Sequence, residues 1–105
     1  MANLMRQGDV LIIPIKAIPK SAKLAKPDNG RVILAYGEAT GHAHAILERA
    51  SMWEDIAAGR NFLSVAEGGA DVVHEEHSTI KLDAGLYEVR RQREYSPEAI
   101  RNVSD

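Results

Sequence analysis

Residues 36–48 read Tyr-Gly-Glu-Ala-Thr-Gly-His-Ala-His-Ala-Ile-Leu-Glu, and this stretch decides how the chain is organised. It carries His42 and His44, while the other two histidines of the protein, His74 and His77, lie close together further along the chain. On a β-strand, residues i and i+2 point to the same face, so the first pair can aim both imidazoles at one point. Neutral imidazole is the commonest protein ligand of divalent metals, and the pattern therefore predicts a metal site.

The second pair adds to this site only if the chain turns sharply between its members. His74 and His77 are three residues apart, so they share a face on a helix or tight turn but point oppositely on a straight strand. Glu75 and Glu76 between them either orient a histidine or belong to a solvated turn. Metal-free readings stay open, namely two separate hydrogen-bonded pairs or a histidine-lined surface. The site hypothesis requires the two pairs to meet in the folded chain.

Length and composition predict one domain spanning residues 1–105, with an aliphatic core. The hydrophobic fraction is 45%, but there are only one Trp, one Phe and three Tyr. A net charge of −2 argues against nucleic acid and membrane surfaces as partners. The absence of cysteine excludes disulfides, thiolate metal sites and cysteine nucleophiles. With no secretory signal and no apolar run of membrane-spanning length, we expect a cytoplasmic protein.

Short β-branched and alternating segments predict six or seven strands, at residues 10–15, 31–36, 42–48, 61–66, 71–74, 79–82 and 86–95. Pro14 predicts a sheet edge or a bulge, because proline cannot donate to a ladder. The lysine-rich segment 17–30 is expected to be a solvated loop that ends in a tight Asn29-Gly30 turn. Residues 49–59 are helix-like in part, and we expect a single turn or an excursion between two strands there. Ser96-Pro97 predicts a short C-terminal helix. The fold class expected is all-β, a small antiparallel barrel or sandwich.

The spacing of His42, His44 and Glu48 resembles the first motif of the cupins. Residues 77–88, centred on Gly85, resemble the second cupin motif, although Asp83 stands in place of its proline and Glu88 in place of its histidine. The resemblance implies a small β-barrel that binds a divalent metal at its mouth. It makes His42, His44 and Glu48 the ligands and leaves the fourth open among His74, His77 and Glu88.

A second resemblance covers the whole chain. Residues 37–44, 74–77 and 92–95 are similar to stretches shared by small bacterial and phage-associated proteins, among them a Gly-Glu-x-Thr-Gly-His-x-His motif. This resemblance implies no activity.

Two histidines and one carboxylate leave open positions on a metal, which is typical of a catalytic site. The same set suits non-haem iron, whereas three or four histidines suit zinc, nickel or copper, and manganese also fits a mixed oxygen and nitrogen set. The sequence therefore predicts a divalent metal without identifying it. Whether the protein is an enzyme acting on a small molecule stays open.

Two other functions use the same residues. Paired histidines can act as general acid and base on a phosphodiester or RNA, with Arg90, Arg91 and Arg93 binding phosphate. Alternatively, the protein is an assembly subunit, a homo-oligomer with histidines at its interface, as in a bacterial or phage accessory protein.

Overall fold

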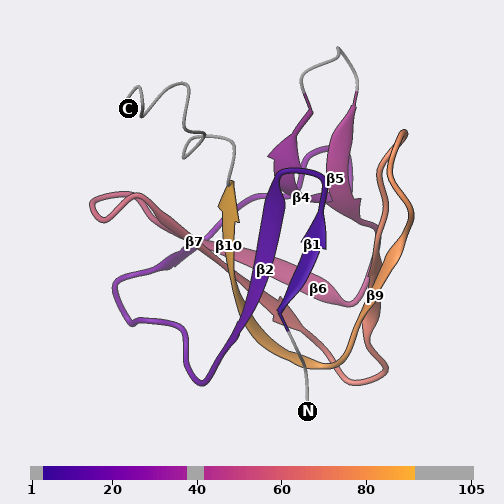
Figure 1. Ribbon diagram of the computed structural model, residues 1–105. Coiled ribbons are helices and arrows are strands. Elements are labelled where there is room, and N and C mark those ends of the chain that lie inside the picture. Colours follow the sequence, from indigo (N-terminus) through magenta and orange to yellow (C-terminus); the bar gives the residue numbers. More distant parts are fainter. Residues whose placement is uncertain (1–3, 38–41, 92–105) are drawn as a thin grey trace, which may run out of the picture.

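The computed structural model describes residues 4–37 and 42–91, which form antiparallel strands joined by turns and loops (Figure 1). The strands are β1 Met5–Gln7, β2 Val10–Ile15, β3 Lys23–Leu24, β4 Val32–Tyr36, β5 Ala43–Ile46, β6 Ala50–Asp55, β7 Arg60–Val65, β8 Ala70–Val72, β9 Ile80–Leu82 and β10 Gly85–Arg91. The prediction of an all-β antiparallel fold is confirmed.

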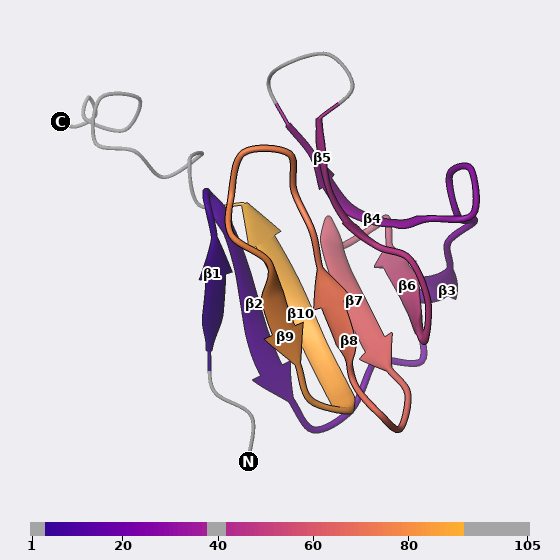
Figure 2. The same cartoon turned by 90° about the vertical axis from the view of Figure 1, so that its right-hand side faces the viewer.

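The strands form one large sheet and two small ones. The large sheet has the order β1-β2-β10-β7-β6-β3, while β4 pairs with β5 and β8 pairs with β9. In Figure 2 the β8–β9 sheet lies in front of β10 and β7, and the β4–β5 ribbon projects from the upper end of the molecule. Since β1 and β3 are edges of the large sheet, the described strands make an open layered structure. The predicted closed barrel is not found among them.

An aliphatic core holds the layers together, as the composition predicted. Its fully buried members come from every layer: Val10 and Ile12 from β2, Leu63 from β7, and Val72 and Leu82 from the small β8–β9 sheet. Burial of one such side chain contributes about 1.5–3 kcal/mol to the free energy of unfolding. The small sheet is thereby fixed over the large one, and the loop between β8 and β9 is held beside β5.

Two local predictions agree with the structure. Asn29 and Gly30 both have positive φ, 54° and 77°, between the bridged residues Asp28 and Arg31, so this is the tight turn that Asn-Gly favours. Pro14 lies in β2, but β1 pairs only with the part of β2 that ends at Ile12. β1 therefore does not pair with β2 at Pro14, where the proline has no N–H to donate to a neighbouring strand.

The expected helix-like part of residues 49–59 is not found, and a strand followed by a turn occupies the segment. Residues 50–55 form β6, which pairs with β7 so that Met52 faces Leu63 across the ladder. Met52 is the buried residue of this strand, and residues 56–59 form a turn after it. That turn is closed by the Ala58 N–H, which donates to Asp55 Oδ1 at 3.2 Å.

The predicted C-terminal helix and the end of the last strand lie outside the described residues. Within the described part of the chain, no helix is long and apolar enough to cross a membrane.

Leu63→Ala tests the core and Leu47→Ala is its matched control, because Leu63 is 0% exposed and Leu47 is 62% exposed. We expect Leu63→Ala to lower the free energy of unfolding by about 2–5 kcal/mol through lost burial and the cavity it leaves. Leu47→Ala should change it by no more than about 0.5 kcal/mol. Urea unfolding followed by circular dichroism measures both, and equal effects would contradict the layered core.

Candidate functional site

A single β-bridge brings the two histidine-bearing segments together. Ala45 and Val73 exchange backbone hydrogen bonds of 3.0 and 2.8 Å, in an antiparallel pairing of β5 with the chain just after β8. Counting outward along antiparallel chains sets His44 opposite His74, and directly opposed side chains on one face are neighbours. The two imidazole rings accordingly lie 4.3 Å apart between centroids.

A bend at residues 75–77 brings the fourth histidine into the same group. The rings of His74 and His77 are 4.6 Å apart, and His77 stacks at 5.8 Å from His44. On the other side, His42 meets His74 edge-on at 5.7 Å. The four histidines of the sequence thus form one cluster, as the site hypothesis requires.

Gln7, at the end of β1, is hydrogen-bonded to the cluster and to the chain on both sides of its bend. Its side chain is buried, and its amide nitrogen donates to Val72 O and Ser78 O, both at 2.9 Å. Since both amide protons are used, the amide oxygen is the atom that meets His44 Nδ1 at 2.8 Å. An oxygen there requires a proton on Nδ1, so the neutral imidazole of His44 has its lone pair on Nε2.

His44 is kept neutral by its surroundings. Its side chain is only 2% exposed, and burial lowers the pKa of His44 to about 4, assisted by the positive charge that His74 can carry. Asp9 Oδ1 lies 3.7 Å from Nε2 and opposes this shift. Asp9 is itself held by Arg91 at 3.1 Å. A neutral imidazole is the form that binds a metal.

Three residues at the open side of the cluster could hold a metal ion. His42, His74 and Glu75 each offer one ligand atom, and these atoms lie within 4.8 Å of one another. Ligand atoms about 2.1 Å from one ion are at most about 4.2 Å apart, so small side-chain rotations bring the three together. A hydrogen bond from the Ala43 N–H to Oε1 at 3.0 Å lowers the pKa of Glu75 and favours its carboxylate.

The lone pair of His74 is already in use. The Glu76 N–H donates to His74 Nδ1 at 2.9 Å, which places the proton of the neutral ring on Nε2. An ion bound through Nδ1 takes that lone pair directly, and an ion bound through Nε2 moves the proton to Nδ1. Either way the Glu76 N–H loses its acceptor.

The two carboxylates implied by the cupin resemblance lie outside the cluster. β5 ends at Ile46, Arg49 adopts a positive φ of 63°, and Glu48 is 69% exposed and paired with Arg49 at 2.8 Å. Glu88 lies on β10, where Arg60 and Arg90 bind it at 3.1 and 3.2 Å. The carboxylate that the structure brings to the histidines is Glu75, which the sequence placed beside them without assigning it as a ligand.

Gln7 and Asp9 were not singled out from the sequence. The one available signal is that Gln7 occupies the same strand face as Met5, so a polar residue stands where an apolar one is expected. Gly8 between them has a positive φ of 61°, and a Cβ there would lie 2.6 Å from His77 Nε2. The turn therefore packs against the ring of His77.

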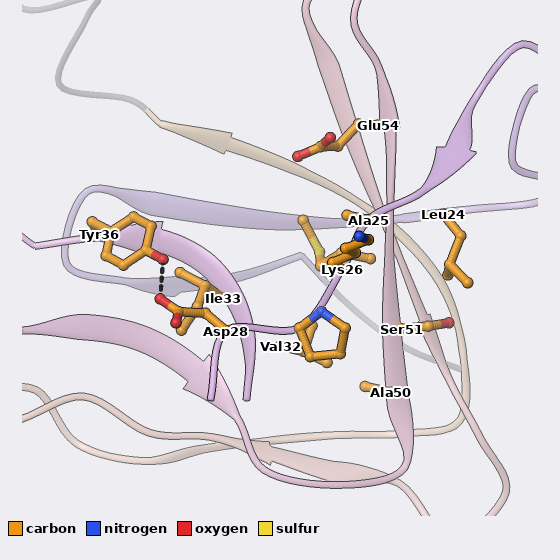
Figure 3. Close-up of a pocket in the computed structure, with 12 residues that line it drawn as sticks. Leu24, Ala25, Lys26, Asp28, Val32, Ile33, Tyr36, Ala50, Ser51 and Glu54 are labelled. Atoms are coloured by element: carbon orange, nitrogen blue, oxygen red, sulfur yellow. Dashed lines mark hydrogen bonds between the residues drawn. The ribbon is translucent and has the colours of Figure 1, made fainter. Parts of the chain in front are cut away.

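A pocket of about 260 Å³ lies apart from the histidines, between the chain after β3, strand β4 and strand β6 (Figure 3). Its floor is apolar, with Val32, Ile33 and Met52, and at its rim the Tyr36 hydroxyl donates to Asp28. No histidine lines it. It is a separate feature and contributes no ligand to the cluster.

Comparison with known proteins identifies a family but no activity. The model of a family described as a domain of unknown function, DUF8820, matches residues 6–92, which include all four histidines and Glu75. No curated protein and no solved structure matches the chain.

The depressed pKa of His44 predicts how stability changes with pH in chelator. The pKa of His44 is 6.5 in the unfolded chain and about 4 in the folded chain. Between these two pH values the unfolded chain binds a proton that the folded chain does not bind, so acidification lowers the free energy of unfolding. The slope contributed is at most about 1.4 kcal/mol per pH unit, and the loss of stability is absent above pH 6.5 and complete below about pH 4. Urea unfolding across this range should show this loss, and His44→Gln should lack it. Identical pH profiles for the two proteins would contradict the assignment.

Proposed function

We propose that this chain, which belongs to the DUF8820 family of domains of unknown function, binds a divalent transition-metal ion through His42, His74 and Glu75. The observation that carries the proposal is the convergence of these three ligand atoms from two segments far apart in the sequence. His44 and His77 stand immediately behind the group. The cupin resemblance supports a metal site, but the ligands proposed differ from its His42, His44 and Glu48.

The ligand chemistry favours borderline metals. Two imidazole nitrogens and one carboxylate suit zinc, iron, nickel or manganese better than calcium or magnesium, which prefer all-oxygen sites. Three protein ligands leave at least one position for water or a substrate, as in catalytic zinc sites. We therefore propose metal-dependent chemistry on a small molecule as the function best supported by the site. An ion there lowers the pKa of bound water and polarises a bound carbonyl or phosphoryl oxygen.

Metal analysis of protein purified without a histidine tag tests the proposal. We expect bound ion after dialysis against metal-free buffer, and an affinity for Zn²⁺ that falls by about 100-fold or more in the double variant His42→Ala, His74→Ala. Loss of a ligand should exceed the 10- to 100-fold cost of losing a hydrogen-bond partner of a ligand. Wild-type protein that binds no ion under varied growth conditions would overturn the proposal.

Glu75→Gln and Glu48→Gln form a matched pair of variants. They test whether the carboxylate ligand is Glu75, as the structure suggests, or Glu48, as the cupin resemblance implies. Each variant replaces one exposed carboxylate with a neutral amide, and each site is close in sequence to a histidine pair. We expect Glu75→Gln to weaken Zn²⁺ binding by about 10-fold or more, because it removes a direct ligand. Glu48→Gln should leave affinity unchanged within about twofold. The opposite ranking would restore Glu48 as the ligand.

The Glu76 amide reports directly on His74. Since either nitrogen of His74 binds an ion only at the expense of the hydrogen bond from the Glu76 N–H, we expect that amide to lose protection from hydrogen exchange as Zn²⁺ is added. Amide signals in ¹⁵N-edited NMR spectra follow this residue by residue. The amides of Ala45 and Val73 serve as the control, because their bridge does not involve a ligand atom. An unchanged Glu76 amide at saturating Zn²⁺ would exclude His74.

A further inference from the structure

The outer face of the large sheet, which is turned away from the β8–β9 sheet, carries a separate group of charged side chains. Side chains alternate along β10, so Tyr87 and Val89 point into the core while Glu88 and Arg90 point outward. Arg60 joins them from the neighbouring strand β7. Three charged residues from two adjacent strands therefore meet on this face.

One carboxylate in this group holds two guanidiniums. Glu88 Oε2 accepts from Arg60 Nε at 3.1 Å and from Arg90 Nε at 3.2 Å, and Oε1 accepts from the Nη2 atoms of the same arginines at 3.1 and 3.3 Å. The Glu88 side chain is only 6% exposed, and the hydrogen bonds from Arg60 hold its pKa below the usual range, so the carboxylate is charged. The two arginines therefore share a single negative charge.

Each guanidinium keeps hydrogen-bond donors for a further ligand. A guanidinium has five N–H groups in a planar fork, and Glu88 takes only those of Nε and one of Nη2 from each arginine. The side chains of Arg60 and Arg90 are 49% and 50% exposed, so the remaining N–H groups are accessible from solvent. The carboxylate fixes the inner edges of both forks and leaves their outer edges available.

A hollow of about 410 Å³ lies beside the two arginines, at the end of β10. It is lined by both guanidinium-bearing residues and by the turn residues Ala58 and Gly59, and no histidine lines it. Asp55 lies across the β6–β7 ladder from Arg60, but its two oxygens accept from Ser21 and Ala58. The hollow is therefore an anion site distinct from the histidine cluster.

The arrangement of donors favours a phosphate group over a carboxylate. A carboxylate offers one pair of oxygens, which a single guanidinium fork satisfies, whereas a phosphate monoester has three terminal oxygens and can accept from two forks at once. Its charge of about −1.5 to −2 also offsets the positive charge that Glu88 leaves uncompensated. Two guanidiniums on one carboxylate make a single anion site and not the extended basic track that a nucleic-acid backbone requires.

The surface next to the arginines is apolar. Phe62 is the cross-strand partner of both Glu88 and Trp53, so these three side chains lie on the same face of the sheet. Phe62 is 1% exposed, and the Arg60 guanidinium lies over its ring at 5.2 Å. Beyond it, Trp53 and Leu86 line a hollow of about 390 Å³ that is mainly apolar. The body of a phosphate ester bound by the arginines has this apolar surface within reach.

We propose that Arg60 and Arg90 bind the phosphate group of a small phosphate monoester whose apolar or aromatic body lies over Trp53. Glu88 is a positioning residue, because it fixes the orientation of both guanidiniums. The site uses none of the proposed metal ligands, so it does not depend on the proposed function.

Titration of the full chain with phenyl phosphate tests the site, with the arginine Nε–H signals followed in ¹⁵N-edited NMR spectra. Chelator is present throughout, so that phosphate cannot bind through an ion at the histidine cluster. We expect the signals of Arg60 and Arg90 to shift together and to saturate. Inorganic phosphate should shift the same signals with an affinity about 10-fold or more lower, because it has no apolar body to bury.

Arg60→Lys and Arg90→Lys keep the positive charge but remove the fork. We expect each to weaken phenyl phosphate binding by about 10-fold or more, because an ammonium is a point charge without the paired donors. Arg49→Lys is the matched control, because Arg49 is also 49% exposed and ion-paired with a glutamate, Glu48, but does not line the hollow. It should leave the affinity unchanged. Circular dichroism of each variant confirms that the fold is retained.

The remaining outcomes would overturn the proposal or one of its parts. Arginine signals that do not shift at millimolar phenyl phosphate would exclude the site. Full affinity in both Arg60→Lys and Arg90→Lys, or an equal loss in Arg49→Lys, would show general charge attraction instead of a fork. Equal affinities for inorganic and phenyl phosphate would exclude the apolar body, and tighter binding of polyuridine RNA would exclude a small molecule. Each of these results leaves the metal proposal untouched.

Discussion

The exchange of two backbone hydrogen bonds between Ala45 and Val73 is the constraint on which the site depends. β5 is already paired with β4 on one side, so the bridge makes the segment after β8 its partner on the other. Antiparallel register then dictates every neighbour further along: His44 meets His74, and the Ala43 N–H meets Glu75. A shift of one residue in this register would turn the histidines of one segment to the opposite face. The cluster is therefore specified by backbone pairing, before any side chain interacts with another.

Gln7 supplies the second constraint, because a bridge of one residue pair does not by itself fix a loop. One amide nitrogen holds the chain on both sides of the histidine bend, at Val72 and Ser78, while the amide oxygen selects the tautomer of His44. Leaving a buried carbonyl without a donor costs about 1–3 kcal/mol, so neither bond is easily given up. The residue paired with Gln7 across the β1–β2 ladder is Val10, which is fully buried in the core, so the sheet fixes the backbone of Gln7. Backbone register and a buried amide thus jointly make the site rigid.

The sequence predicted seven of the ten described strands, missing β1, β3 and β6, and it predicted the site in part, for reasons that differ between residues. The apolar run of β2 and the Asn29-Gly30 turn are local signals, and local chemistry decided them. The two histidine pairs were visible as a pattern, but their meeting depends on pairing between residues 28 positions apart, Ala45 and Val73, which no local signal encodes. Glu48 was implied by the resemblance to the first cupin motif, whereas β5 ends before it, at Ile46. Asp9 could not be found because an ordinary polar residue in a short turn has no distinguishing periodicity, and the only sign of Gln7 was its place on the Met5 face of β1.

Hydrogen bonds within the cluster also bear on which ions the proposed metal site would accept. His74 Nδ1 accepts from the Glu76 N–H and Glu75 accepts from the Ala43 N–H, so an ion must compete with the protein for donor atoms. A net hydrogen bond is worth about 0.5–1.5 kcal/mol, and its loss lowers the affinity of every ion alike. An ion that binds imidazole strongly, such as Zn²⁺ or Ni²⁺, retains useful affinity after this loss, whereas Mg²⁺ and Ca²⁺ bind nitrogen too weakly to do so. These hydrogen bonds would therefore make the proposed site selective for transition-metal ions over Mg²⁺ and Ca²⁺.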